Sequence, residues 1–275
     1  MTSRVALSTR LTEAVEALPI QMGNTAVRLG PGALGLLLGL FIWHLGAVAY
    51  GPFVLPTPLA TAKAVASVLS SVDGWAAVLS TIVRVISGLA ISLTIGAGLG
   101  IAAGYVPFLL RMLMPWATIL LGMPAIAWII LTMIWFGPSH GAVIFTVSVM
   151  TTPVLFMGAA EGVLVRDRRL DDMALGFGAS AWQQFLRVGL FQIAGHLAPV
   201  MAIALALGFK VAIMSELITS VTGIGGELAL ARTHLDVDMA MAWVVLAVSG
   251  LLAVEHTAVR PLRRRLERWR AIGRG

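Results

Sequence analysis

The residues best suited to specific chemistry in this chain lie in one polar segment, residues 172–188, between two long apolar runs. The segment contains Gly-Phe-Gly at 176–178, and glycine tolerates the left-handed backbone conformations that end a helix. Ser180 and Gln183 have the spacing of a capping box, which begins a new helix. The segment therefore predicts a helix–turn–helix element that presents a docking surface.

The second of these two helices has an apolar face. Trp182, Phe185 and Leu186 share that face at helical spacing, whereas the polar Arg187 lies on another. The element is therefore expected to lie near a membrane surface. A plain interfacial hairpin, in which Trp182 only anchors at the lipid headgroups, is the alternative.

Two charged residues near the end of one apolar run, Lys210 and Glu216, are candidates for a transport pathway. A charge deep in a membrane span costs about 2.5–3.5 kcal/mol on insertion scales. Three roles are open for Lys210: it attracts an anion, it extends its amine to the interface, or it pairs with Glu216. A separation of six residues puts Lys210 and Glu216 on different faces of one helix, which argues against the pairing. Glu216 is either part of a gate or a solvated helix end. Arg84 is expected at the outer interface.

A second candidate part of the pathway surrounds a proline. Pro124 leaves a backbone carbonyl without its helical partner, which membranes tolerate only where neighbours or water satisfy it. Met123, Pro124 and Trp128 line a pathway or form a packing kink. Close helix packing is expected from one set of glycines: Gly88, Gly96, Gly98, Gly100 and Gly104.

The sequence contains no residue pattern typical of a catalytic or metal-binding site. The absence of Cys excludes disulfides, thiol chemistry and cysteine metal sites. The histidines have no metal-ligand grouping, and no nucleophile–His–Asp set is present. A Gly-rich phosphate-binding loop ending in Lys-Ser/Thr is also missing. We expect no catalytic, cofactor-binding or metal-binding residues, and any energy must come from another polypeptide.

The elements that position these residues are membrane-spanning helices. The chain is 59% hydrophobic and 12% charged, about half the charge of a soluble domain. An all-α integral membrane protein is predicted, and no cleavable signal precedes its first apolar run. The sequence contains six apolar runs of spanning length: 31–50, 84–105, 113–136, 141–161, 193–217 and 239–259.

The distribution of basic residues predicts the orientation. Most of the 19 Lys and Arg residues fall on the side that holds both termini, which makes that side cytoplasmic. Three regions follow: a cytoplasmic segment 1–30, a six-span domain 31–260 with a cytoplasmic loop at 162–192, and a basic cytoplasmic tail 261–275. The positive tail is read as a membrane anchor, not as a nucleic-acid site.

The cytoplasmic loop resembles that of the permease subunits of bacterial ABC importers. Their loop carries Glu-Ala-Ala, a three-residue gap, Gly, and then Ile-x-Leu-Pro. The match aligns five residues with this pattern: Asp172, Ala174, Gly178, Val188 and Leu190. Three positions depart from it: Asp172 in place of Glu, Met173 in place of Ala, and Phe191 in place of Pro.

Other segments resemble the sulfonate, taurine and nitrate subgroup of that family. They are Leu-Pro-Thr-Pro at 55–58, Met-Pro-Ala-Ile-Ala-Trp at 123–128, Trp-Phe-Gly at 135–137, Gly-Ala-Ser at 178–180, the spacing of Lys210 and Glu216, and Gly-Ile-Gly at 223–225 followed by Leu-Asp at 235–236. The resemblance covers residues 50–260.

The resemblance implies a non-catalytic permease that dimerises in the bacterial inner membrane. Two soluble subunits would bind ATP and Mg²⁺, and a periplasmic or lipid-anchored protein would deliver the solute. Whether the permease is a homodimer or a heterodimer stays open. The ATPase-docking residues would be Asp172, Met173, Ala174, Gly178, Ser180, Trp182 and Arg187. The pathway residues would be Met123, Pro124, Trp128, Lys210 and Glu216.

The resemblance leaves several solutes open. An organic sulfonate, taurine or a nitrate-like anion is the first expectation, and a vitamin precursor or another small nutrient is the alternative. A secondary carrier or channel is a competing class. Six spans without an inverted repeat or a buried carboxylate cluster argue against it.

Overall fold

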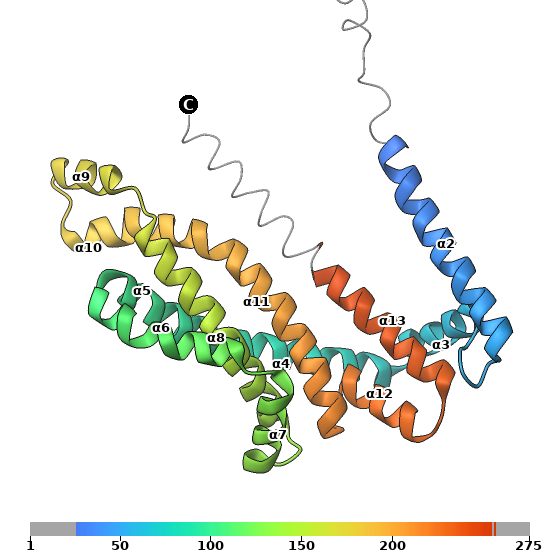
Figure 1. The fold of residues 1–275 in the computed structure, drawn as a ribbon. Coiled ribbons are helices and arrows are strands. Elements are labelled where there is room, and N and C mark those ends of the chain that lie inside the picture. Colours follow the sequence, from blue (N-terminus) through green and yellow to red (C-terminus); the bar gives the residue numbers. More distant parts are fainter. Residues whose placement is uncertain (1–25, 255, 257–275) are drawn as a thin grey trace, which may run out of the picture. The chain divides into compact units, whose positions relative to one another are not determined.

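The computed structural model describes residues 26–254 and His256, and every regular element in those residues is a helix (Figure 1). This confirms the all-helical prediction. The chain divides into two compact units, Met1–Leu59 and Ala60–Gly275. The predicted segment 1–30 lies largely outside the described residues, and the predicted basic tail 261–275 lies entirely outside them.

The first unit contains helix α2, Ala26–Tyr50. Between residues 34 and 45 its leucines and phenylalanine are exposed, as in a lipid-facing helix. The connection after this helix is held against it. The Trp43 indole nitrogen donates to the Pro56 carbonyl oxygen at 2.9 Å. A Cβ on Gly46 would lie 3.1 Å from a methyl group of Leu55, so the connection packs closely on the helix.

The second unit is organised around helix α8, His140–Leu164. In its most apolar 18-residue stretch, 67% of α8 is buried. It packs against α11, Leu190–Thr219, and against the helical run α4, η1 and α5. The core cluster around Val143 and Val147 includes Phe209 from α11. A helix that is apolar on all sides and buried in this way belongs in the centre of a bundle.

One continuous helix covers Val72–Tyr105, 34 residues long. It begins in α4, Val72–Ser92, where the Ser71 side chain caps the Gly74 amide. It passes through the π-helical turn η1, Leu93–Ala97, into α5, Gly98–Tyr105. The predicted span 84–105 is therefore extended toward the N-terminus. The apolar residues Trp75, Val78, Leu79 and Ile82, at helical spacing, indicate this extension in the sequence.

Glycines bring this long helix close to α8. A Cβ on Gly96 would lie 2.6 Å from the Thr152 carbonyl oxygen, and one on Gly100 would lie 2.3 Å from the Phe156 carbonyl oxygen. Gly88 and Gly104 approach α8 in the same way. The packing prediction is wrong for Gly98, which has open space where its Cβ would be.

The predicted span 113–136, with Pro124 inside it, is not one continuous helix. Two helices, α6 at Pro107–Gly122 and α7 at Ala125–Phe136, meet at an angle of 93°. Met123 between them has extended backbone angles, because the ring of the following proline disfavours a helical conformation. Pro124 therefore ends one helix instead of kinking a continuous one.

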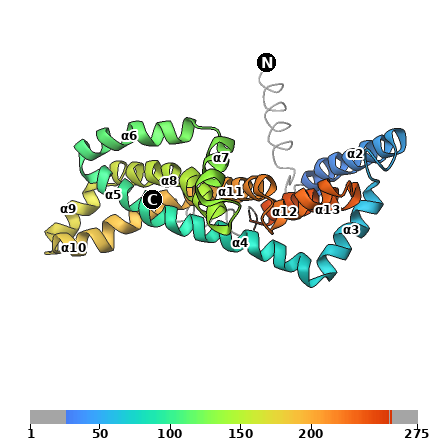
Figure 2. The same ribbon diagram turned by 90° about the horizontal axis from the view of Figure 1, so that it is seen from below.

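Short turns connect the neighbouring helices. Gly137, with φ +66°, ends α7, and the Ser139 side chain caps α8 through the Ala142 amide. After α8 come α9 at Arg168–Gly176, α10 at Ala181–Gln184 and the π-turn η2 at Phe185–Gly189. Beyond α11 lie α12, Ile224–Thr233, and α13, Val237–Val254. Figures 1 and 2 place α9 and α10 at the end of α11 away from α12.

The described residues contain four stretches that are long and apolar enough to cross a membrane, or five if α6 and α7 form one broken span. The four are Gly32–Tyr50, Val72–Tyr105, His140–Leu164 and Ala181–Thr233. Helix α13 is apolar but shorter, and the predicted end of its span at residue 259 lies outside the described residues. The count of six spans stays a prediction.

Candidate functional site

A buried ion pair joins the two long helices α4 and α11. The Arg84 guanidinium donates to the Glu216 carboxylate, and the two residues are 1% and 0% exposed. The Thr81 hydroxyl donates to Glu216 Oε2 at 2.8 Å. Charged groups withdrawn from water need partners of this kind, because an unpaired buried charge is strongly unfavourable.

The start of helix α12 completes the carboxylate's surroundings. The Gly225 amide donates to Glu216 Oε2 at 3.1 Å, and the Ile224 amide donates to the Thr81 hydroxyl at 2.9 Å. The N-terminus of a helix favours a negative charge. A Cβ on Gly223 would lie 2.5 Å from the Glu216 carboxylate, so only glycine lets the backbone approach this closely.

His140, the first residue of α8, adds a fourth element to this network. Its Nδ1 atom accepts from Arg84 Nε at 3.0 Å and lies 2.7 Å from Nη2. The buried charge network, defined as Thr81, Arg84, Glu216, the Ile224 and Gly225 amides and the exposed His140 at its edge, thus fixes α4, α8, α11 and α12 to one another.

Three expectations about these residues are wrong. Arg84 does not lie at a solvated interface, and Glu216 is not a solvated helix end, because both are fully enclosed. Glu216 pairs with Arg84, so pairing with Lys210 is also wrong. Lys210 is exposed and forms no ion pair with a described residue. The pairing had one signal in the sequence: opposite charges in two different apolar helices, each otherwise costly there.

The polar loop has the predicted helix–turn–helix form. Helix α9 ends at Gly176, and Gly178 has the left-handed φ of +79°. The capping box is present: the Gln183 amide donates to the Ser180 hydroxyl at 3.3 Å, and the Ser180 amide donates to Gln183 Oε1 at 3.0 Å.

The tip of this loop is apolar and open. Met173, Phe177 and Trp182 are 53%, 84% and 66% exposed. Trp182 stacks on Phe185 with ring centroids 5.8 Å apart, which confirms that these two share a face. The remaining docking candidates lie around them: Asp172, Gly178, Ser180 and Arg187 are exposed, and Ala174 is half-buried. The structure thus brings the seven candidates together on one element.

The candidate pathway residues are not brought together in the same way. Met123 and Pro124 lie at the bend between α6 and α7. Trp128 packs against the core cluster that includes Phe209, and its indole nitrogen is buried without a hydrogen-bond partner among the described residues. Glu216 is enclosed in the buried charge network.

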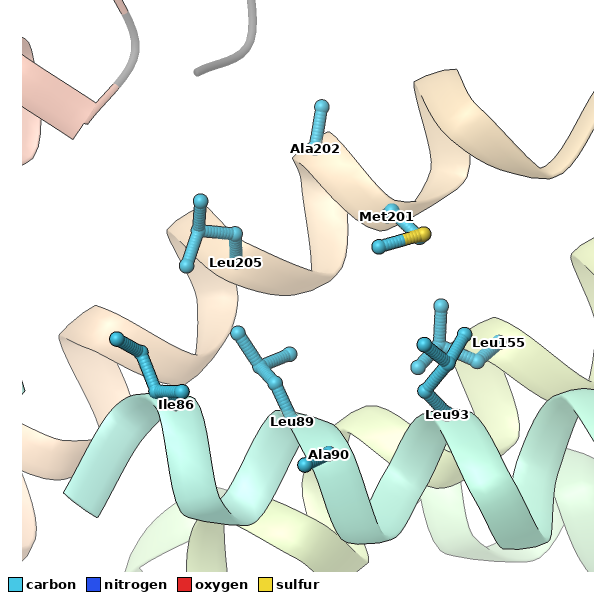
Figure 3. A pocket seen from close by; sticks show the side chains of 8 residues that line it. All are labelled: Ile86, Leu89, Ala90, Leu93, Leu155, Met201, Ala202 and Leu205. Carbon is cyan, nitrogen blue, oxygen red and sulfur yellow. The ribbon is translucent and has the colours of Figure 1, made fainter. Parts of the chain in front are cut away.

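An apolar groove of 320 Å³ lies between α4 and α11, with α8 at its base. Figure 3 shows the side chains of Leu89 from α4 and Leu93 from η1 facing Met201 and Leu205 from α11. None of the five candidate pathway residues lines it. In the described part of the chain, no group of three or more His, Asp or Glu residues is placed to hold a metal ion.

Relatives of known designation are membrane permeases. The taurine transport system permease protein TauC of Escherichia coli is 26% identical over 250 residues, 88% of this chain and 90% of the relative. The riboflavin transport system permease protein RibX of Chloroflexus aurantiacus is 26% identical over 239 residues, 86% of this chain and 88% of the relative. SsuC of Escherichia coli, a permease named for aliphatic sulfonates, is 33% identical over 134 residues, 47% of this chain and 50% of the relative.

A protein family matches most of the chain. Residues 94–270 fit the family described as the inner membrane component of binding-protein-dependent transport systems. The match includes the helix–turn–helix loop, α11 and α12, and thus most of the features described above. The chain therefore belongs to this family, the non-catalytic, multi-pass membrane permeases of ABC importers.

Proposed function

We propose that this chain forms the translocation pathway of an ABC importer and is driven by ATP hydrolysis in a partner subunit that docks on α9 and α10. The family implies ATP-binding and solute-binding partners. One observation carries the docking site: the exposed apolar side chains of Met173, Phe177 and Trp182 on a short element with a glycine turn. A cluster of this kind is typical of a protein-binding surface.

The proposed assembly has two permease copies, two ATP-binding subunits and a periplasmic or lipid-anchored solute-binding protein. ATP and Mg²⁺ bind to the partner subunits. In the proposed topology, both termini and the α9–α10 loop are cytoplasmic, the broken pair α6–α7 is the third of six spans, and α13 begins the sixth. The bias of Lys and Arg toward the side of the termini supports this orientation.

For the solute, we propose taurine, another organic sulfonate or a nitrate-like anion. The names of TauC and SsuC support this class. The name of RibX, which is as similar to this chain as TauC is, favours a vitamin or other small nutrient as the second candidate. The uncharged lining of the groove between α4 and α11 is compatible with a solute that has an apolar portion.

The function is tested with the complex that co-purifies with this chain, reconstituted in lipid vesicles. ATP hydrolysis should rise when the loaded solute-binding protein is added, and taurine or riboflavin should accumulate only with ATP. Uptake by the permease alone, without a partner and without ATP, would instead identify a secondary carrier or channel.

The glycine turn of the loop provides a sharp test of docking. Gly178→Val forces a side chain into a left-handed conformation, which costs about 1–2 kcal/mol for a residue other than glycine. Because the space around Gly178 is open, the change acts on the backbone and not on packing. We expect lost or weakened binding of the ATP-hydrolysing subunit, measured by co-purification and ATPase activity.

Gly176→Val is the matched control for that variant. Gly176 also has open space around it, but its φ is not left-handed. It should retain binding of the partner. Normal ATP-driven transport by Gly178→Val would argue against docking at this turn.

Lys210 provides a test of the anion hypothesis. Lys210→Met removes the exposed positive charge of α11 while it keeps a long apolar side chain. Uptake of taurine should fall while the complex still assembles and hydrolyses ATP. Lys63→Met, at an exposed lysine of α3 (Pro58–Ser70), is the control and should leave uptake unchanged. Equal uptake in both variants would refute an anion-attracting role for Lys210.

A further inference from the structure

Arg166 connects the loop to a helix that the loop does not adjoin in sequence. It lies between α8 and α9, and its Nε atom is 3.1 Å from Oδ2 of Asp171 in α9. Its Nη1 atom donates to the hydroxyl of Tyr105, and its guanidinium carbon lies 4.5 Å from the centre of the Tyr105 ring. Charge-assisted hydrogen bonds are roughly twice as strong as neutral ones, and the cation–π contact adds to them. One side chain therefore connects α9 to the last residue of α5.

Aromatic contacts connect the same tyrosine to η2 and, through it, to α10. The rings of Tyr105 and Phe185 meet edge to face at 6.1 Å, and Phe185 stacks on Trp182 of α10. Gly189 is buried beside this cluster, where a Cβ would lie 3.3 Å from the Tyr105 hydroxyl. Edge-to-face and stacked pairs hold rings in defined orientations. Both helices of the docking element are thus fixed to the end of α5.

The start of α9 is also fixed by hydrogen bonds, so the docking element does not move independently of the helices beside it. The Asp167 side chain caps α9 through the Arg169 amide at 2.9 Å. The Asp167 amide donates to Gln192 Oε1 of α11 at 2.7 Å. A segment fixed at several points moves as a rigid body when a partner displaces it.

Tyr105 ends the continuous helix Val72–Tyr105, whose α4 part carries Thr81 and Arg84. Along this helix, the docking element and the buried charge network lie at opposite ends, as Figures 1 and 2 show for α9, α10 and α12. The chain itself connects the docking element only to α8 and α11. The contacts of Tyr105 are therefore a separate, non-covalent route to α4 and α12.

We propose that Arg166 and Tyr105 are positioning residues that transmit movement of the docking element into the helix Val72–Tyr105, and through it to α12. The inference rests on the proposed function, because the movement originates in the ATP-hydrolysing partner. It predicts that the partner can bind and hydrolyse ATP in variants in which α4 no longer responds.

The experiment uses the chain's lack of cysteine, since a single introduced cysteine can be labelled uniquely. Val72, the first residue of α4, is 85% exposed. An environment-sensitive fluorophore on Val72→Cys is observed in the whole complex before and after nucleotide trapping with ATP and vanadate. The comparison is made in otherwise unchanged protein and with Arg166→Met, Tyr105→Leu or Tyr105→Phe.

We expect the nucleotide-dependent change in fluorescence at position 72 to fall about fivefold or more in Arg166→Met and Tyr105→Leu. A fivefold effect is the lower end of the usual range for coupling between two sites. Trapped nucleotide should remain normal. Tyr105→Phe keeps the ring but loses the hydroxyl, so its response should be intermediate. The matched control is Phe108→Leu, which removes a ring that is 75% exposed near the same helix end.

A full response in Arg166→Met and Tyr105→Leu, or no nucleotide-dependent change at Val72 in the unsubstituted complex, would overturn the inference. The failure of the proposed function has a different signature: no ATP-hydrolysing subunit binds the chain, or no nucleotide is trapped in the unsubstituted complex. In that case the inference falls with the function.

Discussion

Glu216→Ala is expected to destabilise the protein by about 3–5 kcal/mol, because it leaves Arg84 buried without its partner. The Gly225 amide and the Thr81 hydroxyl lose their acceptor at the same time. Thermal unfolding of the detergent-solubilised protein measures the loss. Arg84→Ala should have a similar effect, since it leaves the carboxylate unpaired.

The double substitution Arg84→Met/Glu216→Met separates two effects on stability. One is the cost of a single buried charge without its partner, and the other is the net stabilisation that the intact pair provides. Replacing both partners of a buried ion pair with apolar residues is often neutral or stabilising. The double variant should therefore unfold at a higher temperature than either single methionine variant. Glu161→Ala, at a carboxylate whose side chain is 67% exposed, is the control and should change stability little. Additive losses in the double variant would contradict the pairing.

The features that followed from sequence are those set by local chemistry. Gly178 has the left-handed conformation expected of a glycine that ends a helix, and Ser180 forms its capping box with Gln183. Long apolar runs became helices at nearly the expected residues, because length and hydropathy alone decide whether a segment can cross a bilayer. Local spacing carries enough information for such features.

The features that sequence reasoning missed depend on residues far apart in the chain. Arg84 and Glu216 are 132 residues apart, and nothing local to either identifies the other as its partner. The same holds for Arg166 and Tyr105, which are 61 residues apart. Whether a glycine packs against a neighbouring helix likewise depends on which face is turned to it, and the stripe at 96 and 100 does not include 98.

The sequence allows a packing kink at Pro124, but it does not predict a bend as sharp as 93°. A proline within an apolar run is compatible with a kinked continuous helix or with two separate helices. Which one forms depends on whether the surroundings supply partners for the two new helix ends. Here α7 packs against α8 and α11, and these contacts stabilise it in a direction different from that of α6. The sequence around Met123 contains no information about that packing.

The close approach of α5 to α8 predicts opposite effects for two glycines in one helix. Gly100→Ala would place a methyl group 2.3 Å from the Phe156 carbonyl oxygen and 2.9 Å from Cβ of Ala159. Because both contacts are with fixed atoms, the helices must separate, and overpacking of this kind costs about 1–3 kcal/mol.

Gly98→Ala meets no atom within 4 Å, so only the backbone effect remains. Replacing a helical glycine by alanine stabilises a helix by up to about 1 kcal/mol. The unfolding temperature should therefore fall for Gly100→Ala and stay the same or rise for Gly98→Ala, in the same detergent and at the same protein concentration. Equal losses in both variants would mean that glycine serves the flexibility of this helix and not its packing on α8. The difference between the two variants thus measures how much of the bundle's stability depends on the contact between these backbones.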